Sequence, residues 1–190
     1  MLHENKQMKE ELMTFKEFIQ KYLKASCTQK WYSIQNPTET KKINVAYLAQ
    51  HPLLDQIPSL QNDIDTNPSL LKSPISYKNI WMGTGDTRTP LHYDSYDNLF
   101  VQIAGVKYVR IYDASESSKL YTLTNDASVG VQRNMSELNC ELEDYEKHPL
   151  AKDAKYVETY MFPGDSLFIP ARAWHYVRSL STSISVNYWW

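Results

Sequence analysis

The sequence predicts a mainly β protein that folds as a single domain, and composition and patterning both support this. Among the 190 residues there are 14 Tyr and 5 Trp but only 5 Gly, an excess of residues that favour pleated, half-buried surfaces. At 42% hydrophobic and 22% charged, the chain has the composition of an ordinary globular domain. A chain of this length buries enough surface to fold without disulfides or a metal.

Short alternating runs, separated by turn residues, predict two groups of strands in the second half of the chain. Gly105 is expected to form a tight link between two strands of the first group. The expected strands are 77–82, 91–94, 98–104 and 106–112 in the first group, and 156–162, 166–169, 175–180 and 183–190 in the second.

Helical and extended segments are expected ahead of these strands. Thr14 and Glu17 have the spacing of a capping box, and the apolar residues that follow recur at helical spacing, so a short amphipathic helix should start there. After a polar loop, residues 43–49 have a β-like pattern. Residues 51–57 are expected to form a helical turn that Pro58 ends or bends.

A polar segment of weak periodicity separates the two groups of strands. We expect it to be an insertion, partly helical around 136–146, because long polar connections in β domains often carry substrate-recognising loops. The expected organisation is one domain over 1–190, with an N-terminal flank over about 1–76, a barrel core over about 77–113 and 156–190, and the insertion over about 114–155.

Charge and hydropathy restrict the class of protein. Lys and Arg number 20 against 22 Asp and Glu, a net charge of −2, so direct binding to nucleic acid is not expected. No stretch has the apolar length of a membrane helix, and residues 1–20 lack the apolar core of a secretion signal. We therefore expect an intracellular protein without membrane contact, nuclear or cytoplasmic, in which Cys27 and Cys140 are reduced and have no role.

Three residues have the chemistry of a metal site. His92 and Asp94 alternate with Tyr93 on an expected strand, so their side chains point to the same face. His175 lies on another expected strand. If the hairpins close into a small barrel, the three side chains can meet at its mouth as two imidazoles and one carboxylate. This is the ligand set of non-haem Fe(II) oxygenases, which leaves positions open for co-substrate and oxygen.

Lys107 is a candidate for binding an anionic co-substrate. It shares a strand face with Val109 and Ile111, which places its ammonium group on an apolar, inward face. Fe²⁺ with one carboxylate keeps a net positive charge, and a dianion such as 2-oxoglutarate would need one further cation. Buried lysines are rare unless paired, and the alternative is a lysine that snorkels at a sheet edge. Asn98 and Thr89 could donate hydrogen bonds nearby.

Taken together, these motifs resemble the JmjC family of Fe(II)- and 2-oxoglutarate-dependent oxygenases. A further segment, 47–58, resembles the small hydroxylase subgroup of that family, and the resemblance begins at about Leu12 and excludes 26–42 and the insertion. The implied fold is a double-stranded β-helix, a cupin-like jelly roll, with flanking helices. The segments that carry the resemblance are 89–94, 98–102, 107–110, 163–175 and 185–190.

The resemblance implies a role for each site residue. It makes His92, Asp94 and His175 the iron ligands and therefore the catalytic residues, and it makes Lys107 the partner of the distal 2-oxoglutarate carboxylate, with Asn98 and Thr89 as further co-substrate contacts. Family members often have a tyrosine near the co-substrate, just before the first helix. An ungapped comparison places His3 at that position.

Three functions are compatible with this resemblance. The first is hydroxylation of a side chain such as arginine in a protein or peptide, with O₂ as oxidant and release of succinate and CO₂. The second is demethylation of N-methyl-lysine by the same chemistry. The third is a catalytically silent binding module. The sequence shows no Cys/His zinc modules of the kind that often accompany chromatin-directed demethylases, which favours hydroxylation.

Two groups of side chains each allow two interpretations, one of which concerns the substrate. The acidic residues of the insertion are expected to form a solvated face, or to attract a basic peptide. The tryptophans are expected to be mostly core packing, with an aromatic cage for a cationic side chain as the alternative. The acidic residues are Glu137, Glu141, Glu143, Asp144 and Glu146, and the tryptophans are Trp81, Trp174, Trp189 and Trp190.

Overall fold

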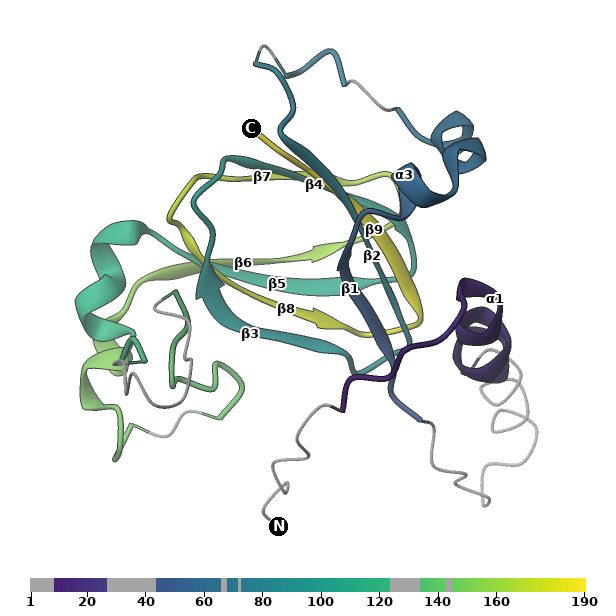
Figure 1. Ribbon diagram of the computed structural model, residues 1–190. Coiled ribbons are helices and arrows are strands. Elements are labelled where there is room, and N and C mark those ends of the chain that lie inside the picture. Colours follow the sequence, from purple (N-terminus) through teal and green to yellow (C-terminus); the bar gives the residue numbers. More distant parts are fainter. Residues whose placement is uncertain (1–8, 27–43, 66–67, 72, 124–133, 143–144) are drawn as a thin grey trace. The chain divides into compact units, whose positions relative to one another are not determined.

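The structure is a computed structural model that describes residues 9–26, 44–65, 68–71, 73–123, 134–142 and 145–190 (Figure 1). The chain consists of two compact units, Met1–Asn44 and Val45–Trp190. None of the helices in these described ranges is both long enough and apolar enough to cross a membrane.

The first unit contains the expected amphipathic helix. Helix α1 (Phe15–Phe18) continues directly into a π-helical segment, η1 (Ile19–Lys24). Both hydrogen bonds of the predicted capping box are present, since the Glu17 amide donates to the Thr14 hydroxyl and the Glu17 carboxylate accepts from the Thr14 amide. The prediction of the helix start is therefore confirmed.

The second unit is a pair of antiparallel sheets with the arrangement of a jelly roll. The five-stranded sheet has the order β1 (Tyr47–His51), β2 (Tyr77–Gly83), β9 (Ser183–Trp189), β4 (Asn98–Ala104), β7 (Ser166–Ile169). The four-stranded sheet has the order β3 (Arg88–Tyr93), β8 (Trp174–Ser179), β5 (Lys107–Tyr112), β6 (Tyr156–Met161). The expected fold class is confirmed.

The alternation of side chains explains how the two sheets enclose a core. On β5, Val109 points between the sheets, while Tyr108 and Tyr112 point to the outer face. Apolar side chains from both sheets meet in the space between them. The buried members of this core are Phe100, Val109, Met161, Ile169, Ala173 and Val177.

All strands expected from residue 77 onward are present, and the largest difference is at β3, which begins at Arg88 rather than residue 91. Pro90 obscures the pattern there, because it lies within a register irregularity between Thr89 and His92. Proline is tolerated at such a position because β3 is at the edge of its sheet.

The elements just ahead of β2 differ somewhat from the expectation. The β-like run is strand β1, which begins at Tyr47, and residue 43 lies outside the described residues. The expected helical turn is α3 (Leu53–Gln56). Pro58 begins a separate 3₁₀ helix, η2 (Pro58–Asp63), for which its fixed φ is well suited.

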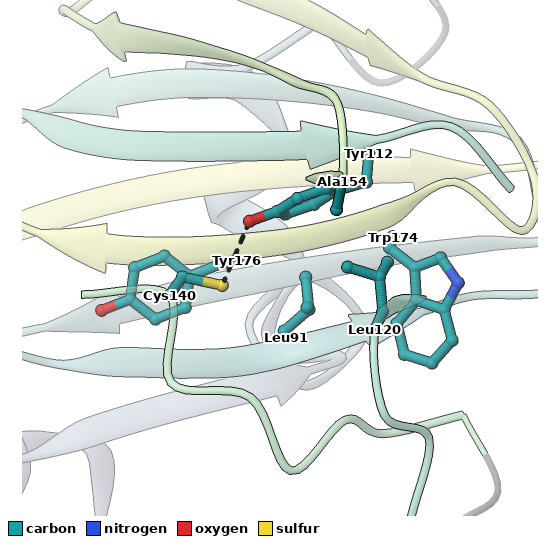
Figure 2. Packing of buried hydrophobic residues seen from close by; sticks show 7 residues of the cluster. All are labelled: Leu91, Tyr112, Leu120, Cys140, Ala154, Trp174 and Tyr176. Atoms are coloured by element: carbon teal, nitrogen blue, oxygen red, sulfur yellow. Dashed lines mark hydrogen bonds between the residues drawn. The ribbon is translucent and has the colours of Figure 1, made fainter. Parts of the chain in front are cut away.

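The insertion covers the outer face of the four-stranded sheet. It contains two 3₁₀ helices, η3 (Ala114–Lys119) and η4 (Pro149–Asp153), and contributes Leu120, Cys140 and Ala154 to a buried cluster. Figure 2 shows these side chains packed against residues of the sheet. The sheet supplies Leu91, Tyr112, Trp174 and Tyr176 to the same cluster.

The expectation of a helix around 136–146 is wrong for the residues described there. Ser136 forms an isolated bridge with Thr122, and turns follow it. Local side-chain hydrogen bonds compete with helix formation: the Ser136 hydroxyl accepts from the Leu138 amide, and the Asn139 side chain accepts from the Glu141 amide. Cys140 is buried as a free thiol, whereas Cys27 lies outside the described residues.

Candidate active site

The structure brings His92, Asp94 and His175 together at one point between the sheets. His92 on β3 is directly opposite His175 on β8, and Asp94 follows the end of β3. One ligand atom from each residue lies within 4.8 Å of the others. Asp94 Oδ2 is 3.9 Å from His92 Nε2 and 3.6 Å from His175 Nε2.

Backbone carbonyls orient both imidazoles. His92 Nδ1 is 2.8 Å from the carbonyl oxygen of Pro90, and His175 Nδ1 is 3.1 Å from that of Ala173. Because a carbonyl oxygen can only accept, each Nδ1 carries the proton and each Nε2 directs its lone pair towards the other two residues. This arrangement is typical of histidines that bind a metal through Nε2.

Burial sets the protonation of the cluster. It lowers the pKa of His175 to about 3, with a further contribution from His92, so His175 is neutral at physiological pH. Burial also raises the pKa of Asp94, an effect that a positive charge on His92 would oppose. Two imidazoles and one partly desolvated carboxylate that converge in this way fit the ligand set of an Fe(II) centre.

The cluster faces a small cavity of about 30 Å³ between the two sheets. Thr89 and Asn98, both expected to contact a co-substrate, line this cavity, and the side-chain oxygen of Asn98 has no hydrogen-bond partner among the described residues. The remaining lining residues are Tyr47, Trp81, Phe100, Ile169 and Val177.

Lys107 lies next to the cavity, beneath two of its aromatic walls. Its Nζ is 5.7 Å from the ring centre of Tyr47 and 5.1 Å from that of Phe100. The side chain is 1% exposed, and Nζ has no hydrogen-bond partner within the described part of the chain. Burial lowers its pKa to about 7. Lys107 is therefore not a snorkelling residue, and its ammonium form has no counter-charge among the described residues.

Tyr47 is a cavity residue that the sequence analysis missed. Its hydroxyl is 3.4 Å from the Thr89 hydroxyl, and burial raises its pKa to about 12. It is the first residue of β1. The position given by the ungapped comparison, His3, lies outside the described residues.

The tryptophans do not form one common cage. Trp174 is buried in the outer cluster (Figure 2), where its indole N–H donates to the Ser117 hydroxyl at 2.8 Å. Trp81 alone among them lines the described cavity, and its indole N–H donates to Asn187 Oδ1 at 2.9 Å. The core interpretation is thus confirmed for Trp174.

The acidic residues of the insertion are not uniformly solvated. Glu141 is 3.3 Å from Arg88 and 2.9 Å from Arg178, so it attaches the insertion to the outer edge of the four-stranded sheet. Glu143 and Asp144 lie outside the described residues.

Comparison with known proteins identifies the family. The sequence profile of the cupin-like domain matches residues 2–190. The chain is 41% identical to JmjC domain-containing protein F of Dictyostelium discoideum, over 95% of this chain and 42% of that protein. It is 38% identical to lysine-specific demethylase 8 of Xenopus tropicalis, over 94% of this chain and 37% of that protein.

A shorter relative matches over most of its own length. JmjC domain-containing protein A of Dictyostelium discoideum is 31% identical, over 93% of this chain and 69% of that protein. The chain therefore belongs to the cupin-like JmjC family. It spans about two-fifths of the length of the first two relatives.

Proposed function

We propose that this chain is the catalytic domain of an Fe(II)- and 2-oxoglutarate-dependent oxygenase that hydroxylates a side chain, such as arginine, in a protein substrate. The observation that carries this proposal is the convergence of His92, Asp94 and His175 near a buried lysine, Lys107, for which the described part of the chain supplies no counter-charge. JmjC relatives named as lysine-specific demethylases support this class of chemistry.

Each side chain of the site has a defined task in this proposal. His92, Asp94 and His175 would hold Fe(II), and Lys107 would pair with the distal carboxylate of 2-oxoglutarate. Thr89, Tyr47 and Asn98 would contact the co-substrate by hydrogen bonds from the cavity wall. The two aromatic rings beside Lys107 would exclude water from its ion pair, which strengthens the electrostatic attraction.

Bound iron and 2-oxoglutarate would supply the oxidative chemistry, in which O₂ is consumed, 2-oxoglutarate becomes succinate and CO₂, and one oxygen atom enters a substrate C–H bond. The protein contributes orientation and exclusion of competing reactions. The Nε2 atoms of His92 and His175 are available as ligands because the Nδ1 atoms face carbonyl oxygens.

Demethylation of N-methyl-lysine is the second candidate. The names of two relatives, lysine-specific demethylase 8 and lysine-specific demethylase JMJ30, favour it. The two outcomes differ only in the substrate carbon that is attacked: hydroxylation leaves one added oxygen atom on the peptide, whereas hydroxylation of an N-methyl group is followed by loss of formaldehyde.

An anaerobic titration tests the site directly. Fe(II)-loaded protein should develop the visible charge-transfer absorption of the iron chelate on addition of 2-oxoglutarate, and His92→Ala should abolish it. Succinate release in air should then require Asp94, so equal succinate formation by Asp94→Ala would exclude the proposed enzyme. Mass spectrometry of arginine and N-methyl-lysine peptides separates hydroxylation from demethylation.

A further inference from the structure

One row of directly paired residues crosses the four-stranded sheet at the level of the candidate metal centre. His92 on β3 is opposite His175 on β8, His175 is opposite Ile111 on β5, and Ile111 is opposite Val157 on β6. Residues that are directly opposite share a face of the sheet. The row therefore continues from two candidate ligands to the edge of the sheet, where Figure 1 shows β6.

The inner face of β6 changes from buried to exposed along the strand. Met161, opposite Lys107, is 2% exposed, whereas Val157, opposite Ile111, is 67% exposed. Thr159, between them on the same face, is also exposed. The space between the sheets is therefore covered at the Lys107 end of β6 and open to solvent at the end that is level with His175.

Ile111 and Val157 together form what we call the apolar ledge. A single exposed valine on an outer surface would need no explanation. Val157 differs because it faces inward and is continuous, through the partly buried Ile111, with His175. Arg110 and Glu158 alternate to the opposite face, where they pair with each other, whereas Lys107 is buried on the inner face at the covered end of β5.

We infer that the apolar ledge binds an apolar side chain of the polypeptide substrate, two residues away from the residue that is oxidised. The inference rests on the proposed function, and it adds a feature of the substrate sequence.

Strand geometry gives the spacing. Neighbouring strands are about 4.8 Å apart, so the ledge extends from about 5 to about 10 Å beyond the backbone of His175. In an extended peptide, residues two apart point to the same side and lie about 6.6 Å from each other. In a peptide that runs across the strands from β8 towards β6, a residue whose side chain enters the cavity above His175 would therefore have its second neighbour directly over the ledge.

The apolar ledge disfavours a charged substrate residue at the position two residues from the oxidised one. Among the described residues of β5 and β6, those that share its face and lie nearest are Val109 and Thr159, neither of which can pair with a charged side chain. A charged substrate residue would lose water there without a compensating partner, whereas an apolar residue gains from burial. An apolar residue should therefore bind about 10-fold more tightly than a lysine.

Two pools of fluorescent peptides test the inference without turnover. Each peptide has a central arginine or N-methyl-lysine and mixed flanking residues, with leucine fixed two positions away on both sides in one pool and lysine in the other. Anisotropy is measured with protein that holds Mn(II) and N-oxalylglycine, an unreactive 2-oxoglutarate analogue. The leucine pool should bind about 10-fold more tightly.

Variants on the two faces of β6 supply the control. Val157→Glu should remove the leucine preference and favour the lysine pool. Tyr160→Lys, at a residue that is 57% exposed on the opposite face, should leave the preference unchanged. Thermal melts confirm that both variants fold. Equal affinities of the two pools for the unmodified protein, no binding of either pool, or a leucine preference that survives Val157→Glu would overturn the inference.

If the proposed function fails while the ledge still binds peptides, the experiments give a different result from failure of the ledge itself. A leucine preference that depends on Val157, in a protein that releases no succinate from 2-oxoglutarate in air, would leave the ledge as a binding site and exclude the oxygenase.

Discussion

Met135 of the insertion lies directly opposite His92 in an isolated antiparallel bridge. Hydrogen bonds hold the backbone on both sides of this histidine: the Ser136 amide donates to the Leu91 carbonyl at 2.9 Å, and the Tyr93 amide donates to the Asn134 carbonyl at 3.0 Å. The Asn134 side chain adds a donor to the Tyr93 carbonyl at 2.7 Å. The insertion thus supports the strand that presents a candidate metal ligand.

Replacement of Asn134 should therefore weaken metal binding. Asn134→Ala removes a hydrogen bond next to His92, and the loss of such outer support typically costs 10-fold or more in metal affinity. A calorimetric Mn(II) titration measures the effect. Asn139→Ala is the matched control, because its side chain bonds within the same insertion to the Glu141 amide. Equal Mn(II) affinity of Asn134→Ala and the unmodified protein would contradict the expected support.

The stability of the metal-free protein should increase with pH because of Lys107. Burial lowers its pKa to about 7 from 10.5, so between these values the unfolded chain binds a proton that the folded chain does not. The free energy of unfolding therefore rises with pH across this window and falls as the pH drops towards 7. Urea unfolding at several pH values measures the slope. Lys107→Met should have a smaller slope, and an unchanged slope would refute the assignment to Lys107.

Binding of 2-oxoglutarate should be accompanied by proton uptake at a pH above 7. Lys107 is then mostly neutral, and its pairing with a carboxylate requires the ammonium form, so affinity should fall as the pH rises. Calorimetry in two buffers of different ionisation enthalpy measures the protons taken up. In Lys107→Arg the side chain is always charged. Any binding by this variant should lack the uptake, and uptake equal to that of the unmodified protein would argue against Lys107 as the partner.

Two glycines should respond differently to alanine. Gly105 has φ of +74°, and a Cβ added there would lie 2.1 Å from the carbonyl oxygen of Thr182. Gly164 has φ of +96°, but nothing lies within 4 Å of an added Cβ. We expect Gly105→Ala to lower the free energy of unfolding by about 3 kcal/mol or more, and Gly164→Ala by about 1 kcal/mol. Chemical denaturation of both variants provides the comparison, and similar losses would contradict this account.

The site could be predicted from the sequence because strand periodicity determines which side chains share a face. His92, Asp94 and Lys107 all follow from alternation along their own strands, and the pairing of β3 with β8 adds His175. The place of Tyr47 in the cavity could not be predicted from strand periodicity. Its place depends on the pairing of β1 with β2, where Tyr47 is opposite Gly83, a contact between distant segments that periodicity does not reveal.

The insertion was the least predictable part, because distant contacts determine its conformation. Arg110 on β5 donates to the carbonyl of Cys140 at 2.9 Å, and Arg178 on β8 pairs with Glu141. These contacts hold an irregular segment against the sheet without any repeating pattern in the sequence. Similarly, the exposed position of Val157 follows from the arrangement of the two sheets rather than from the composition of β6, whose sequence YVETYM has no regular alternation.

The position of β9 has a consequence for how the chain can be made. This strand follows β2 and β4 in the sequence, yet it lies between them in the middle of the five-stranded sheet. Until it emerges from the ribosome, β2 and β4 lack the partner that joins them, and their inner faces are exposed. The sheet must therefore form after synthesis of this region is complete, with the slow folding and the exposure to chaperones that such distant pairing brings.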